Sequence, residues 1–506
     1  MRYSFLMILC CLLASKPAGA QDLYPTINKA LPACVRMWGF DTLQQQRTSA
    51  QFSGVVVKGN YILTVAHVTI PGNTYKVFFA DGHETIAEAL GKIELADDKT
   101  RPDVAIMKIL KGDNWPSVAL GSSAALVNNE PCLSIAYPET LNLTQPTVRL
   151  GKVTEPLNRR GFIRSTALME PGDSGGPLFN LAGELIGLHS AIEIPEAANY
   201  DVPVDLYKKY WTALHEPVVY HNWPEKVNKI APVSGKSPMI SKAQIGNYKG
   251  TCIKISSRIN GKSETVLGTV IQSLVVSKNS LVGDSVMIQG KPAIIVARDK
   301  TNDLVLIRPA QKLKGLTFTV KANLQSGDRL IAPVIDSTVS GIISGGPIDL
   351  PKTASAGFLG ATPVHSSNPA KIYFVRPGSP AALHDIRVGD IVPGLNDTLA
   401  IHWPGDILQF KLQRGQESLV KTIVLTYPPQ MIHDHPAEHF AGGKSQRRDG
   451  FNGIYTTDLI LRPQQCGGPV FDAQHHFVGL NIARFSRANS ILISAETIRK
   501  FIEAHP

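Results

Sequence analysis

Residues 170–180 read Glu-Pro-Gly-Asp-Ser-Gly-Gly-Pro-Leu-Phe-Asn, and the expected fold of the chain follows from this stretch. Its serine, Ser174, lies between glycines at a tight bend, ahead of an apolar run typical of a buried strand. Because glycine has no Cβ and tolerates a positive φ, neighbouring N–H groups can converge on one point while the hydroxyl stays exposed. The stretch predicts a nucleophilic serine with an oxyanion hole formed by the N–H groups of Gly172 and Ser174.

A histidine and a carboxylate occur upstream in suitable contexts. Residues 54–68 read as two strands joined by a Lys-Gly-Asn turn, and His67 follows the second strand. Asp103 stands at the head of the run Val-Ala-Ile-Met. The order His67, Asp103, Ser174 is one of the chain orders of the nucleophilic triad. We predict that Ser174 is the nucleophile, that His67 is its general base, and that Asp103 orients the imidazole.

Three segments resemble the trypsin-like serine proteases, and in particular the HtrA/Deg type. They are Gly-Asn-Tyr-Ile-Leu-Thr-Val-Ala-His-Val at 59–68, Asp-Val-Ala-Ile at 103–106 and Gly-Asp-Ser-Gly-Gly-Pro-Leu at 172–178. The resemblance implies two six-stranded β-barrels with the triad in the cleft between them. It also implies polypeptide substrates and a reaction that needs no metal and no organic cofactor.

The resemblance further implies an S1 pocket lined by Leu168, Met169 and Ile192. Trypsin-like cleavage after Lys or Arg needs an acid six residues before the serine, and Leu168 stands there. The expected pocket is apolar and suits small or aliphatic side chains. Asp173 departs from the HtrA pattern, which usually has asparagine. In digestive relatives such an aspartate receives a new N-terminal amine, but no Ile-Val-Gly-Gly activation site is present here, which disfavours that mechanism.

A second, degenerate copy of the pattern follows. The histidine position falls on Ser280 or Asn279, the aspartate position on Asp303 and the serine position on Cys466. A cysteine reacts as its thiolate, which needs a base or a positive field. No histidine occurs between Cys252 and Asp303, so we predict a pseudoprotease in which Ser280, Asp303 and Cys466 are not catalytic. The matching segments are 251–255 with 33–37, 268–271 with 54–57, 302–307 with 102–107, 464–471 with the opening stretch, and 477–483 with 185–191.

An insertion between the halves of this copy resembles a PDZ domain of the HtrA type. The resemblance rests on Gly-Phe-Leu-Gly at 357–360, Pro-Gly-Ser-Pro-Ala-Ala at 377–382 and Ile-Arg-Val-Gly-Asp-Ile-Val at 386–392, with Ser379 as the expected helix cap. It implies that a peptide adds as a strand while backbone N–H groups hold its C-terminal carboxylate. A degenerate domain kept as a spacer is the alternative. The expected binding residues are Gly357, Phe358, Leu359 and Gly360.

The expected fold class is therefore mainly β, with two chymotrypsin-like double β-barrel domains, the second a pseudoprotease, plus one PDZ domain. A length of 506 residues is too great for one core and agrees with several domains. The expected boundaries are 1–20 for a signal peptide, 21–215 for the protease domain, 216–245 for a linker, 246–352 and 429–506 for the two parts of the pseudoprotease domain, and 355–428 for the PDZ domain.

The N-terminus predicts export. Arg2, the apolar residues 5–13 and Ala-Gly-Ala at 18–20 are typical of a cleaved secretory signal, which implies a periplasmic or secreted protein. A lipoprotein attached at Cys10 is the alternative, disfavoured by the large Leu9 before it. No later apolar run is long enough to span a bilayer. The net charge of +10 is scattered and comes with no nucleic-acid motif, so no nucleic-acid partner is expected.

Cysteines and histidines leave further alternatives. Cys34, Cys132, Cys252 and Cys466 follow the predicted signal, and an oxidising compartment would permit a Cys34–Cys132 bridge. Buried free thiols are slightly favoured over that bridge. The spacing of His433, His435 and His439 matches no metal-ligand set, so a solvated loop and no metal are expected.

Three functional hypotheses follow from these patterns. The leading one is an exported HtrA-like serine endopeptidase that cleaves unfolded or damaged proteins. Its rival is a largely non-catalytic peptide-binding or chaperone-like scaffold that uses the PDZ and pseudoprotease domains. A third is a latent protease switched on by a C-terminal peptide at the PDZ domain. The sequence contains no recognisable trimer motif, and a homo-oligomer remains open.

Overall fold

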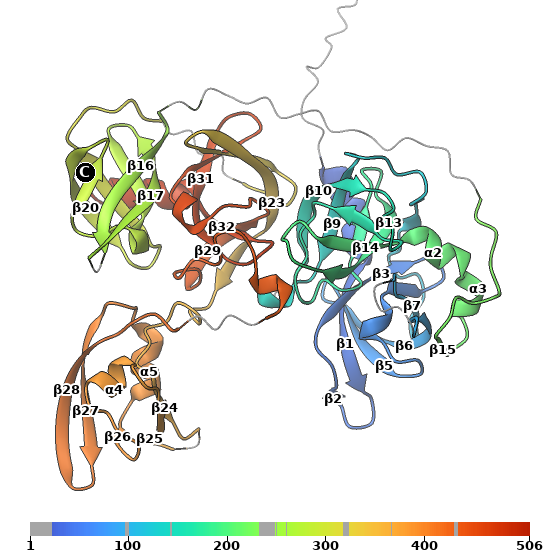
Figure 1. The fold of residues 1–506 in the computed structure, drawn as a ribbon, viewed down its shortest axis with the longest axis horizontal. Helices are drawn as coiled ribbons and strands as arrows, with labels where there is room; N and C mark the ends of the chain where they lie inside the picture. The colour runs from blue at the N-terminus through green and yellow to red at the C-terminus, as the bar shows by residue number, and fades with distance from the viewer. Residues whose placement is uncertain are drawn as a thin grey trace, which may run out of the picture.

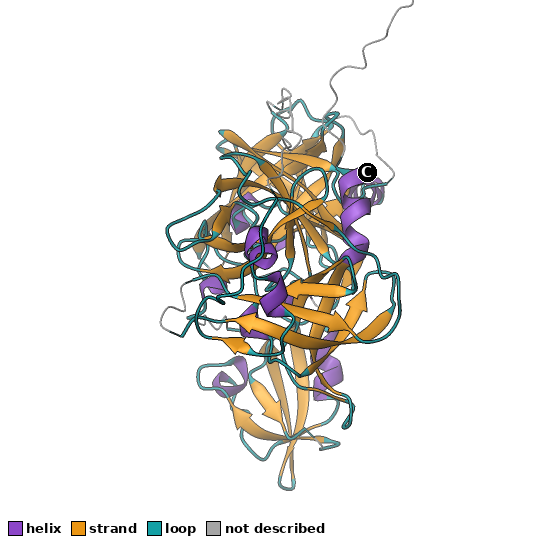
Figure 2. Cartoon of the chain, turned by 90° about the vertical axis from the view of Figure 1, so that its right-hand side faces the viewer, coloured by secondary structure: helices purple, strands orange, loops and turns teal. Residues whose placement is uncertain are grey.

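The computed structural model describes residues 23–96, 101–141, 144–231, 248, 250–259, 261–316, 323–365, 367–429 and 434–506. The fold is mainly β and contains several six-stranded barrels (Figure 1). Figure 2 shows strands throughout the molecule and only short helices between them. The predicted signal, with Cys10 and Cys11, lies outside the described residues. Among the described residues, no helix has the length and apolar character needed to cross a membrane.

The first sheet closes on itself because β6 pairs with both β5 and β7. Six strands form this ring, while β2 extends the β1 hairpin and β15 adds to β6 in parallel. β3 is buried along its whole length, as its run of valines requires. The strands are β1 (Cys34–Asp41), β2 (Gln46–Arg47), β3 (Phe52–Val57), β4 (Tyr61–Thr64), β5 (Thr74–Phe79), β6 (Glu84–Ile93), β7 (Val104–Ile109) and β15 (Val219–Tyr220).

The second sheet closes in the same way, because β12 pairs with both β9 and β13. A single apolar cluster joins the two rings and includes Val55 and Ile106 of the first with Leu133 and Leu188 of the second. The two rings therefore share one core. The strands are β8 (Ala119–Leu120), β9 (Pro131–Ala136), β10 (Thr147–Glu155), β11 (Ile163–Ser165), β12 (Pro177–Phe179), β13 (Glu184–Ile192) and β14 (Asn199–Pro203).

Helices flank these two sheets. The sequence Pro-Val-Asp-Leu-Tyr-Lys-Lys-Tyr-Trp-Thr-Ala-Leu at 203–214 predicts one closing helix. The structure has two instead, α2 (Val204–Lys209) and α3 (Trp211–Leu214), because Tyr210 leaves the helical region at φ −106° and ψ 16°. The predicted linker 216–245 also differs from expectation at its start, since β15 pairs with β6. Residues 232–247 of the linker region lie outside the described part of the chain. The remaining helical segments of this half are α1 (Tyr24–Ala30), η1 (Leu31–Ala33), η2 (Ala66–Val68) and η3 (Glu139–Leu141).

Two further closed barrels form the second half of the chain. The first of these uses β16 to β21, and the second uses β22, β23 and β29 to β32. The strands are β16 (Cys252–Ile259), β17 (Lys262–Ile271), β18 (Leu274–Lys278), β19 (Val286–Ile288), β20 (Lys291–Asp299), β21 (Leu304–Pro309), β22 (Arg329–Val334), β23 (Ser337–Leu350), β29 (Phe451–Thr457), β30 (Pro469–Asp472), β31 (Phe477–Arg484) and β32 (Ser490–Ser494). The 3-10 turns are η4 (Asn279–Leu281), η5 (Pro436–Glu438) and η6 (Pro463–Gln465).

The amphipathic pattern of residues 495–505 predicts a closing helix. The structure confirms it as α6 (Ala495–Glu503), which follows β32. Ser494 caps it by accepting a hydrogen bond from the N–H of Thr497. Between β23 and β29 the chain forms a separate five-stranded sheet, drawn in orange in Figure 1. Its elements are β24 (Ala361–Pro363), β25 (Ala370–Val375), α4 (Pro380–Leu383), β26 (Ile391–Val392), α5 (Leu395–Ile401), β27 (Ile407–Arg414) and β28 (Glu417–Val424). Ser379 caps α4, as predicted.

The four described cysteines are free thiols. Cys34 begins β1 and belongs to the large shared core, whereas Cys132 lies on β9 in a separate cluster of the second ring. Burial raises the pKa of both thiols well above the ordinary value. The structure therefore favours the free thiols over a Cys34–Cys132 bridge.

We expect four reactive thiols when the chain without residues 1–20 is denatured under non-reducing conditions and titrated with Ellman's reagent. In the native state Cys34, Cys132 and Cys466 should react slowly, because all three are fully buried and protonated. A titre of two thiols would show that a bridge forms and would contradict this assignment.

Candidate active site

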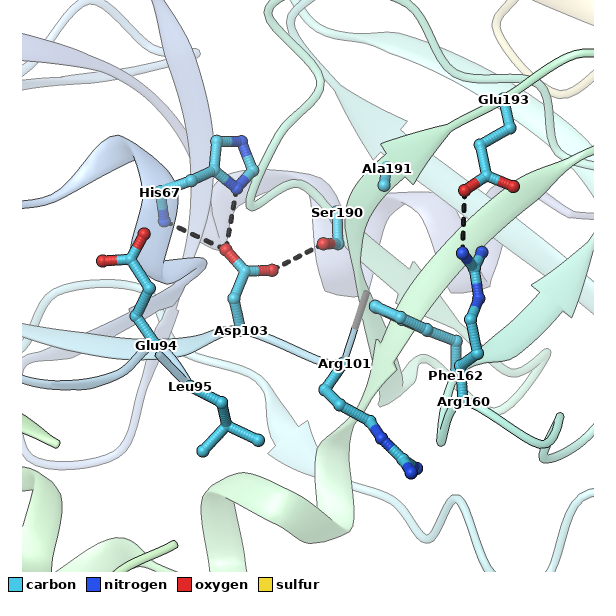
Figure 3. Close-up of a pocket in the computed structure, with 10 residues that line it drawn as sticks. All are labelled: His67, Glu94, Leu95, Arg101, Asp103, Arg160, Phe162, Ser190, Ala191 and Glu193. Carbon is cyan, nitrogen blue, oxygen red and sulfur yellow. Dashed lines mark hydrogen bonds and ion pairs between the residues drawn. The ribbon is translucent and has the colours of Figure 1, made fainter. Parts of the chain in front are cut away.

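Strand pairing brings His67 and Asp103 together. β4 and β7 are antiparallel with Thr64 opposite Ala105, so the residues that follow β4 meet those that precede β7. His67 lies in η2, and its Nδ1 is 2.7 Å from Asp103 Oδ2. The backbone N–H of His67 donates to the same oxygen at 3.0 Å. Two contacts to one oxygen fix both the position and the orientation of the imidazole (Figure 3).

Ser174 approaches from the second sheet, in the loop between β11 and β12. Ser53 of β3 holds this loop, because its N–H donates to the carbonyl of Ser174 at 2.9 Å and its hydroxyl donates to the carbonyl of Gly172 at 2.8 Å. His67 Nε2 lies 3.1 Å from Ser174 Oγ. The structure therefore connects the three predicted catalytic side chains in one hydrogen-bonded chain, with the His67 side chain 44% exposed.

The pair of His67 and Asp103 controls the protonation of the site. Burial alone would lower the pKa of His67, but the hydrogen bond and the charge of Asp103 outweigh it and raise that pKa. Burial likewise opposes ionisation of Asp103, yet the contacts with His67 and with the hydroxyl of Ser190 hold its pKa below the ordinary value. The carboxylate is thus charged when the imidazole titrates.

Ser190 is a site residue that sequence reasoning missed. Its hydroxyl donates to Asp103 Oδ1 at 2.6 Å, on the carboxylate oxygen that faces away from His67 (Figure 3). The residue lies on β13 within Gly-Leu-His-Ser-Ala-Ile at 187–192, a segment that resembles the HtrA type but in which the sequence pattern assigned no role to Ser190. A hydroxyl at this register could have been found only by knowing that β13 passes behind Asp103.

The backbone N–H groups around Ser174, in the loop between β11 and β12, fall into two groups. The N–H groups of Asp173, Gly175 and Gly176 donate to the carbonyls of Glu170, His189 and Asp173 at 3.0, 2.7 and 2.7 Å. Those of Gly172 and Ser174, the predicted oxyanion pair, have no acceptor within the described part of the chain. Gly172 and Gly175 adopt positive φ values of 95° and 80°. The loop therefore leaves unpaired the two donors that an oxyanion would need.

Asp173 has an internal partner in place of a terminal amine. Arg149 of β10 forms a two-pronged ion pair with it, at 2.6 Å from Nη1 to Oδ2 and 3.0 Å from Nη2 to Oδ1, and both side chains are 1% exposed. The same guanidinium donates to the carbonyl of Leu168 at 2.9 Å. Arg149 thus connects β10 to the loop of residues 166–176, which we call the nucleophile loop after the predicted role of Ser174. The sequence pattern did not reveal this arrangement.

A cavity of about 380 Å³ opens beside His67 and Asp103. Its rim carries Arg101, Glu94 and an ion pair between Arg160 and Glu193 at 2.8 Å, all visible in Figure 3. This cavity is therefore ringed by charges of both signs.

The three residues predicted for S1 do not line this cavity. Met169 is 3% exposed and Ile192 is half-buried. Leu168 lines a different cavity, together with Pro195 of the first half and Phe440 of the second half. The structure therefore separates Leu168 from the space beside His67.

A second Ser–His–Asp network lies behind the nucleophile loop. His189 Nε2 is 2.6 Å from Ser134 Oγ, and His189 Nδ1 is 2.5 Å from Asp201 Oδ1. Its connectivity is that of a catalytic triad, so connectivity alone makes it a second candidate. All three residues are 0% exposed, however, and the carbonyl of His189 accepts the N–H of Gly175. In this conformation a substrate cannot reach Ser134, and the network supports the loop that carries Ser174.

The positions of the second half that the sequence matched to the triad carry different groups. Asp303 Oδ1 accepts the N–H of Ser280 at 2.6 Å, the backbone contact that His67 makes with Asp103. The ammonium of Lys278 lies 2.6 Å from Asp303 Oδ2, and only 1% of the Lys278 side chain is exposed. Cys466 is fully buried, and burial raises the pKa of its thiol. The described residues here offer no imidazole and no accessible thiolate.

The predicted peptide-binding loop at 357–360 has its donors partly occupied. Gly357 donates to the carbonyl of His402 at 3.2 Å, and Phe358 donates to that of Thr426 at 2.8 Å. The N–H groups of Leu359 and Gly360 have no acceptor among the described residues. Half of the predicted carboxylate cradle is therefore already used by the fold.

No group of three or more metal-ligating side chains occurs in the described part of the chain. His435 accepts the N–H of Ala437 at 3.1 Å as the cap of η5, and His433 lies outside the described residues.

Replacing Arg149 by methionine should lower the free energy of unfolding by about 3–5 kcal/mol, because it leaves the charge of Asp173 buried without a partner. Urea denaturation monitored by tryptophan fluorescence measures this change. The double variant Arg149→Met/Asp173→Asn should recover part of the loss. A single variant as stable as the unaltered chain would show that the ion pair does not hold the loop.

Comparisons with known proteins agree with the geometry of the first half. Residues 52–188 match the trypsin-like peptidase domain family. The periplasmic serine endoprotease DegP of Salmonella typhimurium is 31% identical over 187 residues, which are 34% of this chain and 37% of that protein. A protein of Buchnera aphidicola named "Probable periplasmic serine endoprotease DegP-like" is 25% identical over 370 residues, 70% of this chain and 72% of that protein.

The chain thus spans about a third of the length of the first curated relatives it matches, 34% and 37%. Among solved structures, the serine endoprotease from Yersinia pestis aligns with 81% of this chain and 99% of its own at 18% identity and a TM-score of 0.32, a likeness too low to bear on the fold. The chain contains a trypsin-like peptidase domain, and its homologues are named serine endoproteases of the DegP type.

Proposed function

We propose that the protein is an exported serine endopeptidase that cleaves peptide bonds of unfolded or damaged proteins through His67, Asp103 and Ser174. The observation that carries this proposal is the continuous chain from Asp103 Oδ2 to His67 Nδ1 at 2.7 Å and from His67 Nε2 to Ser174 Oγ at 3.1 Å. The exposed imidazole separates this network from the buried one around His189. The names of the homologues support periplasmic localisation and polypeptide substrates.

The reaction follows from the positions of these groups. His67 Nε2 takes the proton of Ser174 as the hydroxyl oxygen attacks the substrate carbonyl, and Asp103 stabilises the imidazolium that forms. The unpaired N–H groups of Gly172 and Ser174 donate hydrogen bonds to the developing oxyanion. His67 then gives its proton to the leaving amine, and water releases the acyl group by the same steps in reverse. We propose that Leu168, Met169 and Ile192 form the S1 pocket and that this pocket accepts small or aliphatic P1 residues.

We further propose that the second half is an inactive copy of the first. Gly175 and Gly467 support this, because a Cβ on either would clash with one strand carbonyl and one hydroxyl. At Gly175 these are the carbonyl of Ser53 and the hydroxyl of Thr64. At Gly467 they are the carbonyl of Leu267 and the hydroxyl of Ser277. The N–H groups of both glycines donate to β13 or β31, at 2.7 and 2.6 Å. These equivalent contacts align Cys466 with Ser174 and favour a non-catalytic role for Ser280, Asp303 and Cys466.

The inserted sheet is proposed to be a PDZ domain that binds C-terminal peptides through Leu359 and Gly360, the two loop residues with unpaired N–H groups. A largely non-catalytic peptide-binding or chaperone-like scaffold that uses this sheet and the inactive copy remains the alternative function. We retain the proposed domain boundaries 21–215, 246–352, 355–428 and 429–506 on this basis, and a homo-oligomer remains open.

Degradation of casein should be lost in Ser174→Ala and kept in Ser134→Ala, because only Ser174 faces solvent beside an exposed imidazole. The cleavage rate of Ser174→Ala should be about 10⁵- to 10⁶-fold lower than that of the unaltered protein, since nucleophile and base act as a unit. Peptide release measured by fluorescence of labelled casein provides the readout. Equal activity of Ser174→Ala and the unaltered protein would remove the proposal, and selective loss in Ser134→Ala would transfer it to the buried network.

The acid limb of the pH profile of kcat/KM should lie above the ordinary histidine pKa of 6.5. The sign follows because only the neutral imidazole can act as base, and Asp103 raises the pKa of His67, so the inactive protonated form persists to higher pH. Asp103→Asn should move this limb to lower pH and reduce kcat by about 10⁴-fold. An acid limb unchanged by Asp103→Asn would contradict the assignment of the base.

A further inference from the structure

We infer that the β31–β32 loop of the second half, residues 485–489, positions the nucleophile loop of the first half, with Arg487 as the principal positioning residue. This inference rests on the proposed function. From Thr166 to Gly176 the chain forms no strand, so its carbonyls, apart from those of Glu170 and Asp173, need donors from elsewhere. The requirement is strict here, because these residues include the predicted S1 wall and the nucleophile.

Two buried arginines hold consecutive carbonyls of this loop. Arg149, from the first half, donates to the carbonyl of Leu168 at 2.9 Å. Arg487, from the second half, donates to the carbonyl of Met169 at 2.6 Å. Arg149 is 1% exposed and Arg487 is 0% exposed. The nucleophile loop therefore has one anchor within its own sheet and one supplied by the other half of the chain.

Arg487 also reaches the opposite wall of the predicted S1 pocket. Its Nη1 lies 2.8 Å from Asn199 Oδ1, and its Nη2 donates to the carbonyl of Glu196. Asn199 stands opposite Ile192 in the β13–β14 pair, and its Oδ1 also accepts the N–H of Met169 at 3.2 Å. A single guanidinium thus links the segment before Ser174 to the β13–β14 hairpin.

Charge complementarity strengthens the contact. Glu170, four residues before Ser174, is 4% exposed and accepts Nδ2 of Asn489 at 2.8 Å. Glu196 lies 3.1 Å from Nη2 of Arg484, which is 0% exposed. Two carboxylates of the first half therefore meet donors of the second, in an environment where charge-assisted hydrogen bonds are strong.

The contact joins corresponding hairpins of the two halves. The connection between β13 and β14 spans residues 193–198, and the connection between β31 and β32 spans 485–489. Figure 1 shows the second barrel of the second half, in red and olive, beside the sheet that carries β10 and β14. The inactive copy thus contributes structure to the active site although it has lost its own nucleophile.

The test compares peptide hydrolysis by the full-length chain and its variants, normalised to active sites titrated with a fluorophosphonate. Arg487→Ala should lower kcat/KM by about 10- to 100-fold, mainly through kcat, because the donors and the nucleophile lose their relative positions. Arg487→Lys should fall between, since an ammonium keeps the charge but not the planar fork. Asn489→Ala removes the contact with Glu170 and a longer one with Ser486 within the same loop, and it should show a smaller loss, so it carries the test if Arg487→Ala fails to fold.

Arg447→Ala is the matched control. Arg447 is also a buried arginine of the second half, but its side chain contacts residues of that half, namely Thr301, Asp449, Gly450, Trp403 and Phe451. It should lose stability and keep its kcat per titrated site. A purely structural role of Arg487 predicts the same behaviour for Arg487→Ala.

Unchanged kcat and KM in folded Arg487→Ala and Asn489→Ala, within about twofold, would overturn this inference alone. An unaltered protein that neither cleaves peptide nor reacts with the fluorophosphonate would overturn the proposed function together with it.

Discussion

The shape of the nucleophile loop is the constraint on which the site depends. The loop forms no strand between β11 and β12, so side chains and backbone N–H groups of other segments must hold it. Ser53 fixes its carbonyls at Gly172 and Ser174, Arg149 fixes Leu168 and Asp173, and the two glycines with positive φ allow the bend. Each donor comes from a different strand or loop. The reactive geometry is therefore a property of the packed sheets rather than of the short motif alone.

The molecule contains two Ser–His–Asp networks with similar distances and different surroundings. The network of His67 joins the two sheets beside an open cavity, whereas that of His189 is sealed within the second ring. Hydrogen-bond geometry cannot distinguish a nucleophile from a buried structural network. Access for a substrate can, because attack requires a carbonyl to approach the serine oxygen. The same criterion sets Cys466 apart, since its thiol is buried, and Asp303 is paired with the ammonium of Lys278.

The sequence motifs selected His67, Asp103 and Ser174, which the structure joins by hydrogen bonds, although the sequence predicted a strand pair only within residues 54–68. Sequence reasoning could not find Arg149, Ser190 or Arg487. Arg149 and Asp173 are 24 positions apart, and Arg487 and Met169 are 318 apart, so only the packing of sheets makes them neighbours. The helix expected over 203–214 was wrong in detail, because a backbone break at Tyr210 has no compositional signal. The S1 and domain assignments stay predictions.

Mapping the site of fluorophosphonate modification tests the central claim most directly. The account predicts that tryptic peptides of the labelled full-length protein carry the reagent on Ser174, and that His67→Ala abolishes the labelling. A reagent found on Ser134, or no labelling of a folded protein at any serine, would contradict it.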